Sequence, residues 1–104
     1  MEKFAFKMKL LANHKEFYKK RHDEIWPELV RLLHDAGVSD YSIYLDEETS
    51  ILFAVLKRTK DHTMGSLPEK EVMKKWWKLM QNIVETNPDG SIKVKQLDCM
   101  FHLD

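Results

Sequence analysis

Six consecutive apolar residues, from Ile51 to Leu56, form the most constraining stretch of this 104-residue sequence. β-Branched and aromatic side chains in a run of this length, ending near Arg58, predict a strand. Side chains alternate between the two faces of a strand, so both faces of this one are apolar. An antiparallel sheet in a small two-layer protein normally keeps one face in water. The pattern therefore predicts that a second subunit covers the sheet, as in a homodimer.

The other patterns predict one α+β domain that spans residues 1–104, since the length suits a single core. Residues 59–68 are polar and contain Gly65 and Pro68, so they are expected to form a loop. Strand, helix, strand, strand, helix and strand follow one another, which is the β-α-β-β-α-β, ferredoxin-like split βαβ pattern with an antiparallel sheet. These elements are expected at residues 3–11, 14–37, 38–46, 51–58, 69–85 and 93–103.

Proline interrupts the first predicted helix. Pro27 has no N–H to donate to the carbonyl of Asp23, and it biases Trp26 away from the helical region. We expect a kink or a restart between residues 23 and 27, with the second half ending at Gly37. The disturbance comes directly after His22, and it could turn the imidazole and the neighbouring indole toward a cavity.

Two polar groups lie one turn apart on the apolar face of this helix. At about 100° per residue, Tyr18 and His22 fall on the same stripe as five apolar side chains. Histidine is the side chain best suited to exchange a proton near neutral pH. A phenol and an imidazole that point inward either line a polar pocket or fill a hydrogen-bonded core, and the residues alone leave both readings open. The apolar members of the stripe are Ile25, Leu29, Leu32, Leu33 and Ala36.

Three further aromatic residues are candidates for a binding site. Trp76 and Trp77 are adjacent on the second predicted helix, with Trp76 near the centre of the apolar stripe and Trp77 at its edge. They are either core and rim, or a flat platform on which a sugar ring packs. Tyr41 shares a strand face with Ile43 and Leu45, so its hydroxyl lies either in the core or at a pocket mouth.

Composition argues against several functional classes. Lys plus Arg and Asp plus Glu both number 17, and this balance is not that of a nucleic-acid or anionic-membrane surface. No apolar run reaches membrane-span length. Cys99 is the single cysteine, which fits a cytoplasmic protein without disulfides. We find neither metal-ligand spacing nor a glycine-rich phosphate loop, so no metal and no cofactor are expected.

Five blocks of the sequence, in order, resemble the L-rhamnose mutarotase family. The resemblance spans nearly the whole chain, and residues 58–70 lie outside the matching blocks. It implies a dimeric α+β barrel of ferredoxin-like subunits that interconverts the α and β anomers of L-rhamnose without cofactor or metal. The blocks are Tyr18…Arg21-His22…Ile25-Trp26-Pro27-Glu28-Leu29, Tyr41-Ser42-Ile43-Tyr44-Leu45-Asp46, Leu52-Phe53-Ala54, Trp76-Trp77-Lys78-Leu79-Met80 and Asn87-Pro88-Asp89.

The resemblance also implies a role for each candidate residue. His22 would be the proton donor, and Tyr18, Tyr41, Trp76 and Trp77 would contact the sugar. The protein would then be an isomerase, an aldose 1-epimerase that supports rhamnose metabolism. Mutarotation requires a proton at the ring oxygen while another leaves the anomeric hydroxyl. The sequence does not identify the complementary base, for which Tyr18 and a bound water are both candidates.

Two alternative functions belong to other classes. A cofactor-independent monooxygenase of the related dimeric α+β barrels would have a deep apolar pocket and no affinity for sugars. A non-catalytic sugar-binding module would depend on Trp76 for binding and would be indifferent to the loss of His22.

Overall fold

Four antiparallel strands form one sheet in the order β2-β3-β1-β4 in the computed structural model, which describes residues 1–104. Strand β3 lies between β1 and β2, and the chain crosses from β1 to β2 through two helices. This is the split βαβ arrangement that the order of elements predicts. The strands are β1 (Glu2–Lys9), β2 (Val38–Asp46), β3 (Ile51–Arg58) and β4 (Lys95–Gln96).

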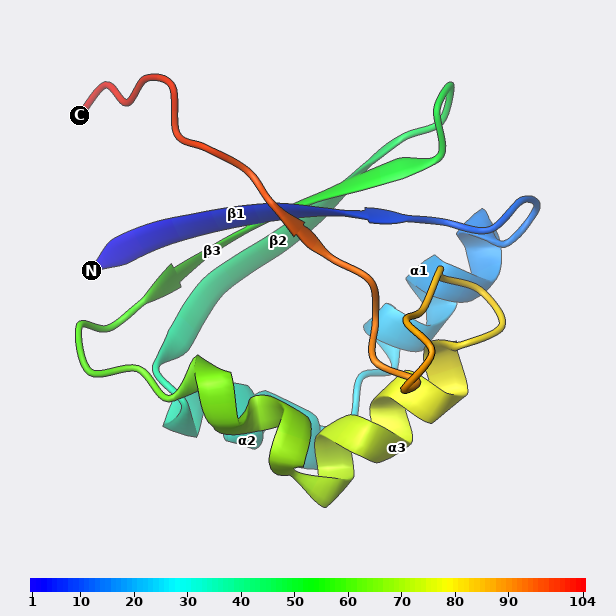
Figure 1. Ribbon diagram of the computed structural model, residues 1–104, viewed down its shortest axis with the longest axis horizontal. Helices are drawn as coiled ribbons and strands as arrows, with labels where there is room; N and C mark the ends of the chain where they lie inside the picture. The colour runs from blue at the N-terminus through cyan, green and yellow to red at the C-terminus, as the bar shows by residue number, and fades with distance from the viewer.

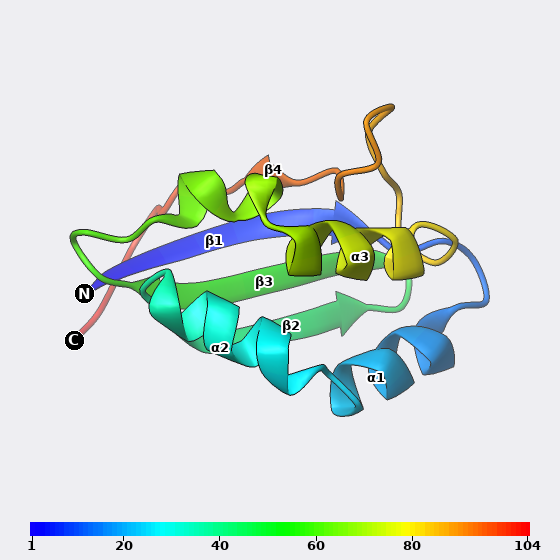
Figure 2. The ribbon, with the colours of Figure 1, turned by 90° about the horizontal axis from the view of Figure 1, so that it is seen from below.

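All helices lie on one side of the sheet (Figure 1 and Figure 2). They are α1 (Lys15–Asp23), α2 (Pro27–Asp35), the short 3₁₀ helix η1 (Met64–Glu69) and α3 (Glu71–Met80). None of them has the length and apolar character needed to cross a membrane.

The predicted interruption at Pro27 is confirmed. Helix α1 ends at Asp23, Trp26 has an extended backbone with ψ 133°, and Pro27 begins α2. The first position of a helix tolerates proline because its N–H would have no partner there. The restart therefore separates the helix that carries Tyr18 and His22 from the helix that continues the apolar stripe.

Several predicted boundaries are wrong, and three of the differences are large. The loop at 59–68 includes most of η1, and the helix expected to reach residue 85 ends at Met80. The chain then turns so that Ile83 and Val84 are buried, and this burial produced the apolar spacing that resembled a longer helix. The last strand, expected over 93–103, has only two residues, because the chain leaves the edge of β1 after Leu97, whose N–H still bonds to the carbonyl of Ala5.

The core lies between the helices and the inner face of the sheet. Phe6 pairs with Ala54 and Met8 with Leu52, and all four side chains are buried. The alternate residues of the central strand point the other way, where Phe53 keeps 40% of its surface exposed. The third strand is therefore apolar on both faces, as predicted, and no helix covers its outer face (Figure 1).

Strand β2 has an irregularity directly before Tyr41. The pairing with β3 shifts register between Ser39 and Ser42, and Asp40 adopts a positive φ of 46°. After this shift the ring of Tyr41 lies on the inner face, 6.2 Å from the ring of Phe6. The predicted face of Tyr41 is thus confirmed, and its side chain points toward the helices.

Candidate active site

The side chains of Tyr18 and His22 stack on one another along α1. Their ring centroids are 4.3 Å apart and the planes differ by 26°. Residues four apart on a helix are neighbours on its surface, which is why the spacing brings them together. Tyr18 is the buried residue of α1, with 8% of its surface exposed, and His22 is partly buried beside it.

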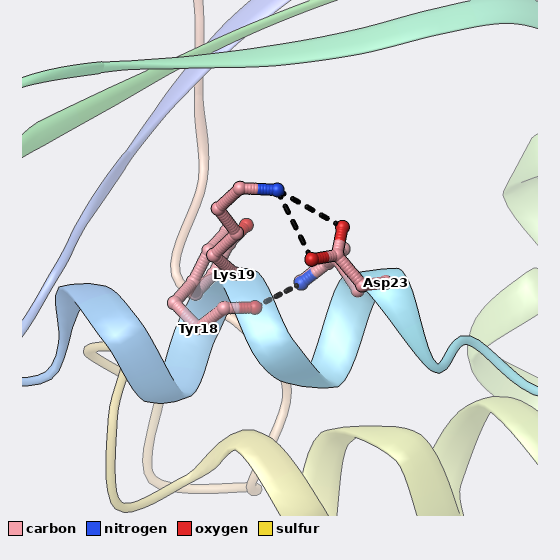
Figure 3. Close-up of polar contacts among 4 residues, drawn as sticks. Tyr18, Lys19 and Asp23 are labelled. Carbon is pink, nitrogen blue, oxygen red and sulfur yellow. Dashed lines mark hydrogen bonds and ion pairs between the residues drawn. The ribbon is translucent and has the colours of Figure 1, made fainter.

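A hydrogen bond to the backbone fixes the tautomer of the imidazole. Nδ1 of His22 lies 2.9 Å from the carbonyl oxygen of Tyr18. Figure 3 draws this contact as the dashed line that starts at the oxygen of the labelled Tyr18. A carbonyl oxygen can only accept, so Nδ1 is the nitrogen that carries the proton. Neutral His22 therefore keeps its lone pair on Nε2, the nitrogen available for chemistry.

The indoles of Trp76 and Trp26 pack beside the stacked rings of Tyr18 and His22. The ring of Trp76 meets the imidazole of His22 edge-on at 5.3 Å, and the ring of Trp26 meets Trp76 at 5.2 Å. Edge-to-face contacts at these distances are favourable for aromatic rings. Trp26 was not among the predicted sugar contacts, but its indole was expected to turn toward a cavity at the break before Pro27, and it does line one.

The two tyrosines of the site stay protonated at neutral pH. Burial raises the pKa of Tyr18, and the nearby Tyr41 hydroxyl raises that pKa further because two phenolate charges would repel. Loss of hydration around its hydroxyl also raises the pKa of Tyr41 to about 12. Both side chains are therefore neutral groups that can donate a hydrogen bond, and neither can serve as a base in its resting state.

Burial lowers the pKa of the His22 imidazole below the ordinary value for histidine. The bond to the Tyr18 carbonyl and the negative charge of Asp23 oppose this effect without overcoming it. Lys19 holds the carboxylate of Asp23 with contacts of 3.0 and 3.1 Å on the exposed side of the helix (Figure 3). His22 is consequently neutral at pH 7.

The structure brings together three of the five predicted site residues, Tyr18, His22 and Trp76. Tyr41 approaches Tyr18 from the sheet closely enough to influence its pKa. Trp77 makes no ring contact with the other four and lies half-buried at the edge of the core. The predicted difference between a central Trp76 and a peripheral Trp77 is thus confirmed.

An open cavity of about 390 Å³ lies beside the aromatic cluster, between α1 and α3. Trp26 and Trp76 form its inner wall, and Lys20, Arg21 and Glu24 supply charged groups. His22 does not line it, so this cavity adjoins the imidazole rather than containing it. No group of three or more His, Cys, Asp or Glu side chains is arranged to hold a metal ion.

An α+β fold that holds a neutral imidazole between a phenol and an indole is an arrangement suited to acid–base chemistry on a small polar molecule. Residues 3–103 match the family model described as L-rhamnose mutarotase. The chain belongs to the L-rhamnose mutarotase family, a family of isomerases. This assignment favours the predicted epimerase over the oxygenase and over the non-catalytic module.

Individual relatives support the same assignment over the full length. The L-rhamnose mutarotase of Agrobacterium fabrum is 65% identical over 103 residues, which cover 99% of this chain and 96% of that protein. The corresponding protein of a Jannaschia species is 60% identical and covers 99% of both chains. The crystal structure of an L-rhamnose mutarotase from Formosa agariphila superimposes with a TM-score of 0.92, at 47% identity and full coverage of both chains.

Proposed function

We propose that this protein interconverts the α and β anomers of L-rhamnose and that His22 carries the proton transfers. Family membership over nearly the whole chain supports the substrate and the reaction. The observation that carries the mechanism is the neutral imidazole, which has Nδ1 bonded to the Tyr18 carbonyl and Nε2 left free.

The proposed mechanism uses one nitrogen twice. Nε2 of His22 takes the proton from the anomeric hydroxyl, the bond between C1 and the ring oxygen breaks, and C1 becomes an aldehyde. The resulting imidazolium donates that proton to the ring oxygen, so His22 is the proton donor of this step and returns to its neutral form. Rotation about C1–C2 and the reverse transfers close the ring on the other face. Both oxygens are bonded to C1, so a single nitrogen can reach each in turn.

The aromatic side chains are proposed to hold the sugar during this sequence. Tyr18 and Tyr41 stay protonated and would donate hydrogen bonds to sugar oxygens, which removes Tyr18 as a candidate for the complementary base. Trp76 would pack against the C–H groups of the ring, and Trp77 at the adjoining edge of α3 is the remaining proposed contact.

Saturation-transfer NMR of L-rhamnose tests the proposal directly. We expect protein-dependent exchange between the α and β anomeric protons for L-rhamnose, and much weaker exchange for galactose and fucose. Absence of acceleration with all three sugars would contradict the proposed activity. Equal acceleration with all three would leave the reaction in place and refute the assigned substrate.

The rate should depend on pH through the imidazole. Because the neutral form accepts the first proton, the catalysed rate is expected to fall as pH decreases through the lowered pKa of His22, with a midpoint below about 6.5. The raised pKa values of the tyrosines predict a flat profile between pH 7 and 9. Catalysed exchange is measured from pH 4.5 to 9, and the spontaneous rate is subtracted. This measurement checks both the fall in rate at acidic pH and the flat region between pH 7 and 9.

Asp23→Asn provides the matched variant for this profile. The carboxylate raises the pKa of His22 from an exposed position, so its removal should move the acidic midpoint to lower pH without a large change in the plateau rate. A profile that rises toward low pH would instead show that the protonated imidazole begins the reaction.

We also propose that two copies associate through the outer faces of their sheets to form a dimeric α+β barrel. Phe53 and Tyr44 expose 40% and 66% of their surfaces on this face, and Met100 and Phe101 of the last segment are almost fully exposed. An apolar surface of this kind on a small protein marks an interaction site.

The exposed thiol of Cys99 suits the reducing cytoplasm that we propose as the location.

Charge on the outer face favours a second copy as the occupant. Strand β1 places Lys7 and Lys9 on this face, on one side of the apolar strand β3, and β2 places Asp46 on the other side. A two-fold axis parallel to the strands sets β1 of each copy opposite β2 of its partner, so that Lys9 of each copy lies level with Asp46 of the other. Complementary charges of this kind fix the orientation of an interface.

Sedimentation equilibrium is expected to give twice the chain mass of 12.4 kDa for the natural sequence. Phe53→Glu should shift the protein to a single chain mass, because the interface would lose its central apolar side chain and would have to desolvate a carboxylate instead. Lys75→Glu, on the exposed side of α3, is the control and should remain dimeric. A single chain mass for the natural sequence would refute the dimer.

A further inference from the structure

The helix that carries His22 is weakly anchored to the rest of the protein. Helix α1 contributes a single buried side chain, that of Tyr18, whereas α3 contributes three, those of Met73, Trp76 and Met80. The chain is also interrupted directly after α1, so α2 does not hold its end rigidly. The position of the imidazole relative to Trp76 must therefore depend on a small number of specific contacts.

One side chain links α1 directly to α3. Nη1 of Arg21 donates a hydrogen bond to the backbone oxygen of Leu79. That carbonyl lies in the last turn of α3, where carbonyls have no partner within the helix and a cation is favourable. The two helices lie side by side at this end of the molecule (Figure 1 and Figure 2).

The hydrogen bond between Arg21 and Leu79 lies close to two residues of the candidate site. Arg21 immediately precedes His22, and Leu79 follows Trp76 by three residues, which is almost one helical turn. The hydrogen bond therefore joins the turn that carries the imidazole to the turn that carries the indole, whose rings are 5.3 Å apart.

We propose that Arg21 is a positioning residue that holds His22 against Trp76 in the geometry required for proton transfer. The other cations of α1 do not make this link. Lys19 is paired with Asp23 in the same helix, and Lys15 is paired with Glu47 in the β2–β3 turn. The inference rests on the proposed role of His22 in anomer exchange.

Arg21→Met and Lys20→Met form the test pair. Both replace a cation on the wall of the cavity beside Trp76, but only Arg21 bonds to α3. Arg21→Met is expected to lower kcat for L-rhamnose anomer exchange at least tenfold at a temperature where it is fully folded. Lys20→Met should keep kcat within twofold of the natural protein, and Arg21→Lys, with a shorter donor, should recover only part of the loss.

A spectroscopic measurement separates positioning from general stabilisation and does not depend on activity. The rings of Tyr18 and Trp76 shift the NMR signals of the His22 ring protons from their free values. We expect these signals to move toward free values in Arg21→Met and to remain in place in Lys20→Met.

Unchanged His22 signals together with an unchanged kcat in Arg21→Met would overturn the proposal. A loss of thermal stability alone, with kcat and the signals retained, would overturn it as well. If the natural protein gave no anomer exchange, the proposed function would fail, while the NMR comparison would still decide whether Arg21 positions the imidazole.

Discussion

Replacing His22 with alanine is expected to lower catalysed anomer exchange by about 10²–10⁴-fold, the usual contribution of general acid–base catalysis. The substitution removes the only group in the aromatic cluster that can both accept and donate a proton near neutral pH, since the tyrosines stay protonated. The rate is measured by saturation transfer at pH 7, with circular dichroism to verify folding.

His34→Ala is the matched control for this experiment. His34 lies exposed near the end of α2, away from the aromatic cluster, and its loss should leave the rate unchanged. Full exchange activity in His22→Ala, with the same pH profile as the natural protein, would remove His22 from the mechanism.

Replacing Trp76 with alanine is expected to reduce the free energy of unfolding by about 3–5 kcal/mol. The indole is 7% exposed and touches both His22 and Trp26, so its removal leaves a cavity at the centre of the site. The same variant should bind L-rhamnose more weakly. Urea unfolding followed by circular dichroism gives the stability change.

Trp77 serves as the comparison for the stability loss expected in Trp76→Ala. Trp77 is only half-buried and makes no ring contact with the site, so Trp77→Ala should cost much less stability. Trp76→Phe keeps an aromatic ring in the core and separates the loss of sugar contact from the loss of fold. Equal destabilisation at the two positions would contradict the assignment of Trp76 as the central residue.

Side-chain alternation and the effects of proline were sufficient to predict the elements whose bounds depend on their own sequence alone. Strands β2 and β3 have the predicted bounds because each carries its own alternation and is limited by turn residues. The break before Pro27 follows from the missing N–H of proline. The end of α3 and the short β4 depend instead on which surface each segment can bury, and periodicity does not contain that information.

In the candidate site, too, some contacts follow from local sequence and others depend on packing between distant segments. Four-residue spacing on one helix was enough to place Tyr18 beside His22. Alternation with Ile43 and Leu45 was enough to place Tyr41 on the inner face of the sheet, whereas the contact of Trp26 with Trp76 depends on packing between two elements. The tautomer of His22 follows from one backbone contact that no spacing rule predicts. The sugar-contact roles of the aromatic residues are still predictions.

The single buried side chain of α1 has a consequence for motion. A helix with so little buried surface belongs to the part of a protein that opens by local unfolding, well before the whole domain unfolds. The amide hydrogens of α1 should therefore exchange with deuterium faster than those of β1 and β3, which pair along their whole lengths. Local opening of α1 would expose the His22 imidazole while the central strands keep their pairing.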